Sequence, residues 1–214
     1  MSAADRPQVG VCDYGVGNLR SVERALLEGG ARPLLSADPG ELAECDGLVL
    51  PGVGAFTVAA RALRERGIDA VVAGMVARGR PVLGVCLGFQ LLFEESDEGS
   101  GGFGLGVLPG RVRRLDAGRG KVPHMGWSRL RVRRESGLLD SLDDGEFMYF
   151  VHSYAAIPDD RGDVIATADY GGEVVAAVER GPVRGTQFHP EKSGAAGLRV
   201  YANFVAGCAA PVRA

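Results

Sequence analysis

The sequence predicts an α/β protein with a mostly parallel central sheet flanked by helices and an additional antiparallel β region. Three observations carry this prediction. Over the first hundred residues, apolar strand-like runs alternate with segments of helical period, which is the pattern of βα units around a parallel sheet. A glycine-rich stretch follows at 99–106. Beyond it the chain reads as short β strands until a last helix at about 195–207.

The first βα units can be assigned from their apolar patterns. Residues 8–14, QVGVCDY, are strand-like, and a helix follows from Asn18, its predicted N-cap. Residues 47–52, GLVLPG, form a second apolar strand that ends in a Pro-Gly-Val-Gly loop. Residues 57–79 have a helical period, and Gly67 is expected to divide them into two helices.

The next strand ends at Cys86, and a helix is predicted over residues 87–95, LGFQLLFEE. After the glycine-rich loop we expect strands in six segments, at 112–115, 129–134, 146–156, 163–170, 174–181 and 183–190. The sequence contains no internal repeat, low-complexity tract or linker rich in proline or serine. Residues 1–214 are therefore expected to form a single domain.

The composition narrows the classes of function. Hydrophobic residues make up 46% and charged residues 24%, with a formal net charge of -3, as in a soluble globular enzyme or binding domain. The four cysteines are scattered, without the spacing of a disulfide scaffold or a metal site, so we expect a cytoplasmic location and no metal. No signal peptide or membrane span is predicted. The basic residues between 111 and 134 alternate along a strand, which favours a solvated face over a nucleic-acid site.

A lone cysteine stands at the predicted junction of a strand and a helix, in GVCLGFQ at 84–90. Gly84 and Gly88 flank Cys86 at the spacing of a nucleophile elbow, a sharp turn that presents the nucleophile at the carboxyl end of the sheet. The free amides and the dipole at the helix N-terminus favour a thiolate there. Taken alone, the motif fits equally well a small buried residue whose neighbouring glycines allow close packing.

A thiolate nucleophile needs a base, and the sequence has three histidines. His189, in TQFHPEKS, ends a strand-like run, and Glu191 follows two residues later. If the backbone stays extended through Pro190, both side chains point to one side and the carboxylate can orient the imidazole. The alternative is a surface histidine beside a charged loop. Cys86 and His189 both fall at strand ends, which share one rim of an α/β sheet.

Six segments spread along nearly the whole chain resemble the class I (triad) glutamine amidotransferases. They are DYGVGNLRSV at 13–22, LPGVGAF at 50–56, GVCLGFQLLFE at 84–94, KVPHMGW at 121–127, VHSY at 151–154 and GTQFHPEKSG at 185–194. Within this family, the resemblance is closer to the glutaminases of histidine biosynthesis. It implies the class I amidotransferase fold for the whole chain.

The resemblance implies that Cys86, His189 and Glu191 form the catalytic triad of a glutaminase and that no cofactor is used. The backbone of Val53 and Leu87 would supply the oxyanion donors. The implied glutamine-binding residues are Gly52, Gly54, Gln90, Glu98, His152, Ser153 and Tyr154. Gln90 lies one helical turn beyond Cys86 and can face the pocket. The alternatives are a surface helix position for Gln90 and a solvated charge for Glu98, which lies in EESDEG.

The resemblance also implies a heterodimeric partner. This is a cyclase subunit with a (β/α)8 barrel, which uses the ammonia to make imidazole glycerol phosphate and an aminoimidazole carboxamide ribotide. The implied interface residues are Asn18, His124, Trp127 and Lys192, of which His124 is expected to be exposed. For Trp127 the alternative is core packing. Ser128 departs from the family, in which asparagine usually follows the tryptophan.

Two other functions remain open from the sequence. The chain could serve a different class I amidotransferase, such as one that makes pyridoxal phosphate, anthranilate or carbamoyl phosphate. It could also be a regulatory subunit that has kept the fold without catalysis. The presence of Cys86, His189 and Glu191 together argues against the second alternative.

Overall fold

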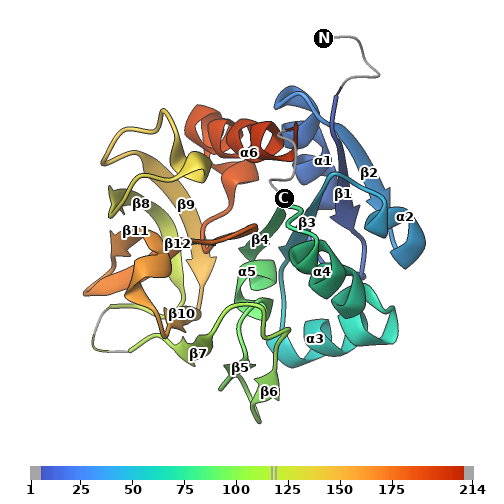
Figure 1. Cartoon of the computed structure of the whole chain (residues 1–214). Helices are drawn as coiled ribbons and strands as arrows, with labels where there is room; N and C mark the ends of the chain where they lie inside the picture. The colour runs from blue at the N-terminus through green and yellow to red at the C-terminus, as the bar shows by residue number, and fades with distance from the viewer. Residues whose placement is uncertain (1–5, 117, 119, 210–214) are drawn as a thin grey trace.

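A nine-stranded sheet forms the centre of the protein in a computed structural model that describes residues 6–116, 118 and 120–209 (Figure 1). The strand order is β2-β1-β3-β4-β13-β12-β11-β8-β9. The first five strands are β2 (Arg32–Ser36), β1 (Gln8–Cys12), β3 (Gly47–Gly52), β4 (Val82–Cys86) and β13 (Val183–Thr186). The other four are β12 (Glu173–Arg180), β11 (Val164–Asp169), β8 (His124–Val132) and β9 (Phe147–His152).

The sheet joins a parallel half to an antiparallel half. Strands β2, β1, β3, β4 and β13 pair in parallel, whereas every pair from β13 to β9 is antiparallel. The antiparallel strands therefore extend the parallel sheet. Because β3, β4, β13 and β9 run in the same direction, their carboxyl ends meet at one rim. This rim is where an α/β sheet places its ligands.

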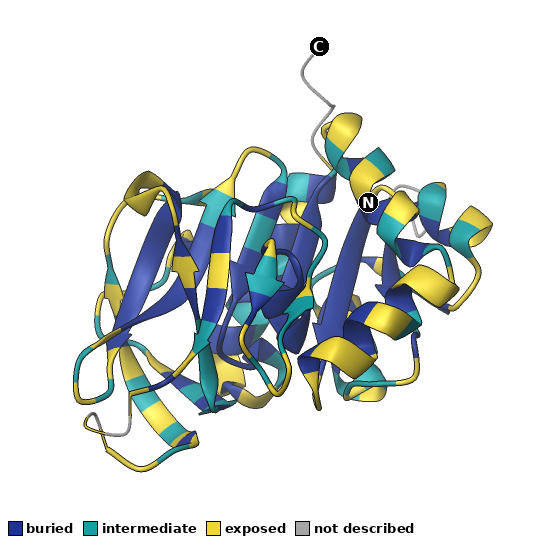
Figure 2. Cartoon of the chain, turned by 90° about the horizontal axis from the view of Figure 1, so that it is seen from below, coloured by how far each residue is buried: buried dark blue, intermediate teal, exposed yellow. Residues whose placement is uncertain are grey.

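Helices cover both faces of the sheet, as the α/β prediction requires (Figure 1). The helices α1 (Leu19–Glu28) and α6 (Gly194–Ala209) pack together over one face, and their apolar residues share a core with β1 and β3. The opposite face is covered by α2 (Pro39–Ala43), α3 (Phe56–Glu65), α4 (Ile68–Ala77) and α5 (Leu87–Leu91). Figure 2 shows buried strands in the middle and exposed outer faces on the helices.

The segment after Cys86 differs from its prediction. Helix α5 ends at Leu91, not at residue 95. The carbonyl of Leu91 accepts a hydrogen bond from Leu105 N at 2.7 Å, and the carbonyl of Phe93, two residues beyond the helix, accepts one from Gly106 N at 3.1 Å. Because these carbonyls have hydrogen-bond partners outside a helix, the helix does not need to continue, and the chain leaves it after Leu91. It then enters a four-stranded sheet of β10 (Tyr154–Pro158), β7 (Gly110–Arg114), β5 (Glu95–Ser96) and β6 (Gly102–Phe103).

Other boundaries also differ from the sequence prediction. Strand β2 and helix α2 were not predicted, and the predicted strand 146–156 is divided at Ser153 into β9 and β10, which lie in different sheets. Asn18 does occupy the N-cap position of α1, but its side chain makes no capping hydrogen bond. Gly67 divides α3 from α4 as expected, with a φ of 69° that favours glycine. Short 3-10 turns occur at Gly137–Leu139, Arg161–Asp163 and Pro190–Lys192.

Two features are absent from the described part of the chain. None of its helices is long and apolar enough to cross a membrane. In the same residues, no group of three or more histidine, cysteine or acidic side chains is arranged to hold a metal ion.

Candidate active site

Cys86 stands on a sharp turn between β4 and α5. The strand is buried along its whole length, between β3 and β13, and Cys86 forms the N-cap of the helix with φ 55° and ψ -108°. A positive φ costs a residue with a side chain about 1–3 kcal/mol, and such strain concentrates at functional sites. The turn leaves Cys86 at the carboxyl rim of the sheet, as the elbow motif predicts.

The two flanking glycines are required by packing. A Cβ atom on Gly88 would lie 1.7 Å from the carbonyl oxygen of Leu50 in β3. A Cβ atom on Gly84 would lie 2.7 Å from both the carbonyl oxygen of Gly88 and the Cα atom of Phe89. The glycines therefore let α5 approach the sheet closely enough to form the elbow. Close packing and the presentation of Cys86 are parts of one arrangement.

His189 and Glu191 form a buried pair, with 2.8 Å between Nδ1 and Oε1 and both side chains 2% exposed. The geometry of this pair differs from the one predicted. The backbone does not stay extended through Pro190, because residues 190–192 form a 3-10 turn. The turn brings the carboxylate back to the ring. The alternative of a surface histidine is wrong, and Glu191 does orient the imidazole.

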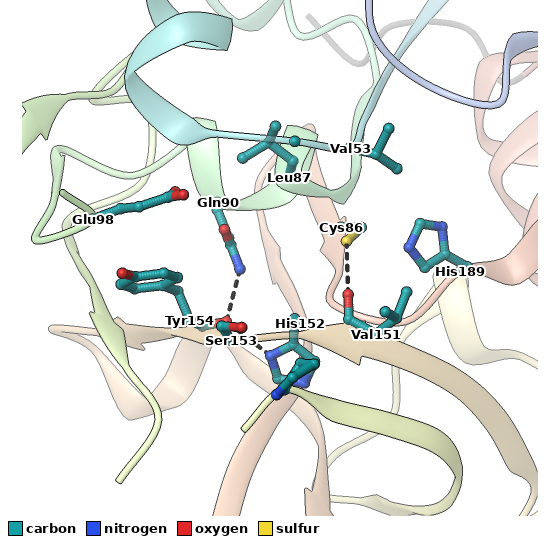
Figure 3. A pocket seen from close by; sticks show the side chains of 12 residues that line it. Val53, Cys86, Leu87, Gln90, Glu98, Val151, His152, Ser153, Tyr154 and His189 are labelled. Carbon is teal, nitrogen blue, oxygen red and sulfur yellow. Dashed lines mark hydrogen bonds between the residues drawn. The ribbon is translucent and has the colours of Figure 1, made fainter. Parts of the chain in front are cut away.

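The other ring nitrogen of His189 faces the cysteine (Figure 3). This Nε2 atom is buried and has no partner within hydrogen-bonding geometry. Burial lowers the pKa of His189, but the nearby sulfur of Cys86 and the carboxylate of Glu191 outweigh burial and raise it from 6.5 to about 9. The imidazole therefore favours its charged form, which can pair with a thiolate and later donate a proton.

The cysteine and the histidine lie in the wall of a cavity of about 370 Å³, a volume that suits a small ligand. The residues that line it are Val53, Gly54, Cys86, Leu87, Gln90, Glu98, Pro123, Val151, His152, Ser153, Tyr154 and His189. The structure thus brings together nearly all the predicted catalytic, oxyanion and glutamine-binding residues. Gly52 is the exception among the predicted ligands, since it lies beside Cys86 in the sheet and does not line the cavity.

Gln90 and Glu98 are both held in place by hydrogen bonds. Gln90 is 5% exposed, so the alternative of a surface position is wrong. Its Nε2 atom donates to the carbonyl oxygen of Tyr154 at 2.8 Å. Glu98 accepts a hydrogen bond from the backbone N–H of Phe56, the first residue of α3, at 2.9 Å. Its carboxylate is therefore fixed at the edge of the cavity (Figure 3).

Two groups around the sulfur were not predicted from the sequence. Gln187 is fully buried, and its Nε2 atom lies 3.9 Å from the sulfur of Cys86. The carbonyl oxygen of Val151 lies 3.9 Å from the same sulfur. The segment that holds Gln187, VRGTQF, mixes apolar, charged and polar residues, so it gave no signal for this residue. The backbone carbonyl of Val151 left none either.

The residues predicted at the partner interface divide into two groups. Asn18 and Lys192 are exposed, and Trp127 is 54% exposed, so the alternative of core packing is wrong for the tryptophan. Trp127 packs edge-on against Tyr149, and the amine of Lys192 lies over the same tyrosine ring. His124 contradicts the prediction of an exposed residue, because it is only 1% exposed. Its ring stacks against Tyr170 and Phe150 inside the protein.

A cysteine on a strained elbow, a histidine beside it and a carboxylate behind the histidine define the site of a hydrolase or transferase that uses a cysteine nucleophile. Residues 11–208 match the family model described as "Glutamine amidotransferase class-I". The chain belongs to this family, and it is a glutamine amidotransferase with glutaminase activity.

Curated relatives are similar over nearly the whole chain. The "Imidazole glycerol phosphate synthase subunit HisH" of Geobacillus kaustophilus is 50% identical, over 92% of this chain and 95% of the relative. The protein of the same name from Natronomonas pharaonis is 50% identical, over 97% of this chain and 99% of the relative.

Solved structures support the fold. A chain described as "Crystal structure of glutamine amidotransferase" superposes with a TM-score of 0.75 at 24% identity, covering 94% of this chain and 99% of the other. A chain of "Structure of PurLQS from Thermotoga maritima" gives a TM-score of 0.74 at 24% identity, with coverage of 94% and 98%. At this identity the two structures show a shared fold alone.

Proposed function

We propose that this protein is the glutaminase subunit of an imidazole glycerol phosphate synthase, a cytoplasmic enzyme of histidine biosynthesis. The observation that carries the proposal is the 50% identity, over nearly the full length of both chains, to subunits of that name. The placing of Cys86 and His189 in the wall of one cavity, with Glu191 paired to His189, supports it. We further propose that residues 1–214 act as one amidotransferase domain.

In the proposed reaction, the sulfur of Cys86 attacks the side-chain amide carbon of glutamine. Before the attack the proton of the thiol already lies on Nε2 of His189, which faces the sulfur, and Glu191 accepts a hydrogen bond from Nδ1 and stabilises this imidazolium. The carbon–nitrogen bond then breaks, and His189 returns the proton to the leaving ammonia. A glutamyl thioester on Cys86 remains.

Hydrolysis of the thioester completes the cycle. His189 removes a proton from a water molecule as it attacks the thioester carbon, and the carbon–sulfur bond breaks to release glutamate and restore Cys86. Both steps place negative charge on the carbonyl oxygen. We assign the backbone N–H groups of Leu87, at the start of α5, and Val53, in the loop after β3, as the donors that stabilise this charge. Losing one such donor typically costs about 2.7–4 kcal/mol.

The cavity offers groups for each end of the glutamine substrate. Glu98 is the proposed partner of the positively charged α-amino group, since its carboxylate is the anionic side chain in the lining. Gln90 and the backbone of residues 152–154 are proposed to hold the remaining polar atoms. Gly54 shapes the loop above the cavity with a φ of 105°. Gly52 is assigned a supporting role behind Cys86.

The proposed partner is a (β/α)8-barrel cyclase that forms a heterodimer with this chain. The cyclase is a lyase, and it consumes the ammonia that this chain releases. Ammonia is mostly protonated near neutral pH and is then not a nucleophile, so its release beside the acceptor is an advantage. We propose that the interface includes Asn18, Trp127 and Lys192, three exposed residues, and excludes the buried His124. An exposed tryptophan is a frequent anchor in such interfaces.

The test is to mix the protein with a candidate cyclase and to follow glutamate release as the ribotide substrate is added. We expect slow release by the chain alone and at least about a tenfold increase with cyclase and ribotide, which corresponds to about 1.4 kcal/mol of coupling. A matched mixture with Trp127→Ala should show a weaker response, because the proposed anchor is removed.

Two outcomes would redirect the proposal. Equal glutamate release with and without the cyclase would contradict the coupling and favour a different class I amidotransferase. No glutamate release under any condition would favour a regulatory subunit that has kept the fold.

A further inference from the structure

One backbone carbonyl, that of Tyr154, is the centre of a buried polar network. It accepts a hydrogen bond from Nε2 of Gln90 at 2.8 Å and another from Nδ1 of His152 at 2.8 Å. From Gln90 the network continues inward through Gln187 to Cys86. From His152 it continues outward to residues of strand β8. The carbonyl of Tyr154 therefore connects the catalytic sulfur with the surface of the sheet.

The inward branch has only one consistent orientation. A carbonyl oxygen can only accept, so the amide nitrogen of Gln90 must point toward Tyr154. The same NH2 group also donates to Oε1 of Gln187, at 3.0 Å. The other end of the Gln187 amide is then its NH2 group, which lies toward the sulfur of Cys86. Gln187 therefore presents an N–H to the sulfur, 3.9 Å away.

The outward branch is equally constrained. Because Nδ1 of His152 faces a carbonyl, it must carry the proton, and Nε2 of the neutral ring must accept. Nδ1 of His124, 3.0 Å away, must then donate. This leaves Nε2 of His124 as an acceptor, 2.8 Å from the hydroxyl of Ser128, which must donate. The carbonyl of Tyr154 thus sets the tautomers of both histidines.

Both histidines lie where the neutral ring is favoured. Burial lowers the pKa of each to about 4, and for His152 the nearby His124 and His189 act in the same direction. His124 also stacks at 3.9 Å between ring centroids against Tyr170. A proton added to Nε2 of His152 would place it face to face with the N–H on Nδ1 of His124 and break the branch.

The backbone of β8 bends to complete this branch. Residues four apart in a regular strand are separated by about 13 Å, yet the side chains of His124 and Ser128 meet. Gly126, between them, has a φ of 138°, which only glycine adopts readily. A Cβ atom on Gly126 would meet nothing within 4 Å, so backbone conformation and not space requires glycine there. The bend brings the hydroxyl onto the ring.

We propose that Ser128, His124, His152 and Gln187 are positioning residues, which hold Gln90 and the sulfur of Cys86 in their active orientation through the Tyr154 carbonyl. The inference rests on the proposed glutaminase function for its kinetic consequences, but its geometry can be tested without activity. Ser128 also has a defined role in it. Its hydroxyl supplies the final donor at the position where asparagine is usual.

The first test is the tautomer of each ring, measured by the nitrogen chemical shifts of the imidazoles in the full chain at pH 7. We expect His124 and His152 to be neutral, each with its proton on Nδ1. A proton on Nε2 of either ring, or a charged ring, would overturn the inference. This measurement requires no substrate or partner, so it tests the hydrogen-bond network even if the proposed glutaminase function fails.

The second test compares two variants in the glutaminase assay with cyclase and ribotide present. His124→Leu removes the donor to His152 and leaves a buried acceptor unpaired. We expect KM for glutamine to rise about tenfold, with a smaller change in kcat, because substrate positioning and not chemistry is disturbed. His124→Asn places an amide N–H near the former Nδ1 position, and we expect it to restore KM to within about threefold of the wild type.

Tyr170→Phe is the matched control for this series. It keeps the ring that stacks on His124 and removes only the hydroxyl that donates to the carbonyl of Lys121. We expect an unchanged KM. The inference is contradicted if His124→Leu leaves KM unaltered, or if His124→Asn raises it as much as His124→Leu. The second result would show that ring packing is what matters.

Discussion

Replacing Cys86 by alanine is expected to abolish glutamine-dependent synthesis by the complex while synthesis from added ammonium salts continues. The sulfur is the nucleophile of the proposed reaction, and no other cysteine lines the cavity. Removal of the nucleophile from a catalytic triad lowers turnover by about 10⁴-fold or more. The measurement is product formation by the cyclase complex with glutamine or with ammonium salts as the nitrogen source.

Cys45→Ala is the control for this experiment. This substitution also removes a buried thiol, but at a position outside the cavity. The sulfur of Cys45 contacts the carbonyl of Glu41 in helix α2. Both nitrogen sources should support normal synthesis in this variant. If Cys86→Ala stopped both routes together, Cys86 would be needed for the structure of the complex and its assignment as the nucleophile would be withdrawn.

The largest effect on stability is expected for Gly88→Ala. The new methyl group would meet the carbonyl oxygen of Leu50, and backbone of a central strand cannot move aside as a flexible side chain can. We expect the free energy of unfolding to fall by about 3 kcal/mol. For a chain of this length, the thermal midpoint should fall by roughly 10 °C. Displacement of α5 should also lower glutaminase turnover, because Cys86 and Leu87 lie at its N-terminus.

Gly137→Ala is the matched control for Gly88→Ala. A Cβ atom at Gly137 would have no neighbour within 4 Å, and this position needs no special backbone conformation. Its unfolding free energy should change by less than about 0.5 kcal/mol. The measurement is thermal and urea unfolding of both variants. Equal stability of the two would mean that the elbow does not depend on close contact with β3.

The sequence was sufficient to predict the elbow and the pairing of His189 with Glu191. The apolar run before Cys86 predicts a buried strand, and the spacing of Gly84 and Gly88 predicts the sharp turn. Both features depend on residues that are neighbours in the chain. Even so, the pairing of His189 with Glu191 arises from a 3-10 turn and not from the predicted extended backbone.

Features that depend on distant segments could not be predicted. Helix α5 ends early because a backbone amide fourteen residues further along the chain, that of Leu105, donates a hydrogen bond to the carbonyl of its last residue, Leu91. His124 is buried because β8 pairs with β9 and brings it against His152 and Phe150. Gln187 reaches Cys86 because β13 lies beside β4. No local pattern of apolar or charged residues in the sequence predicts any of these contacts.

The account depends most on the electrostatic contact of His189 with Cys86 and Glu191, and an NMR titration of the histidine rings tests it most directly. The three rings can be told apart, because burial lowers the pKa of His124 and His152 to about 4. We expect His189 to titrate with a pKa of about 9 in the wild type. In Cys86→Ala the pKa of His189 should fall, because one of the two groups that raise it is gone. A pKa of about 6.5 for His189 in both proteins, the ordinary value for histidine, would contradict the account.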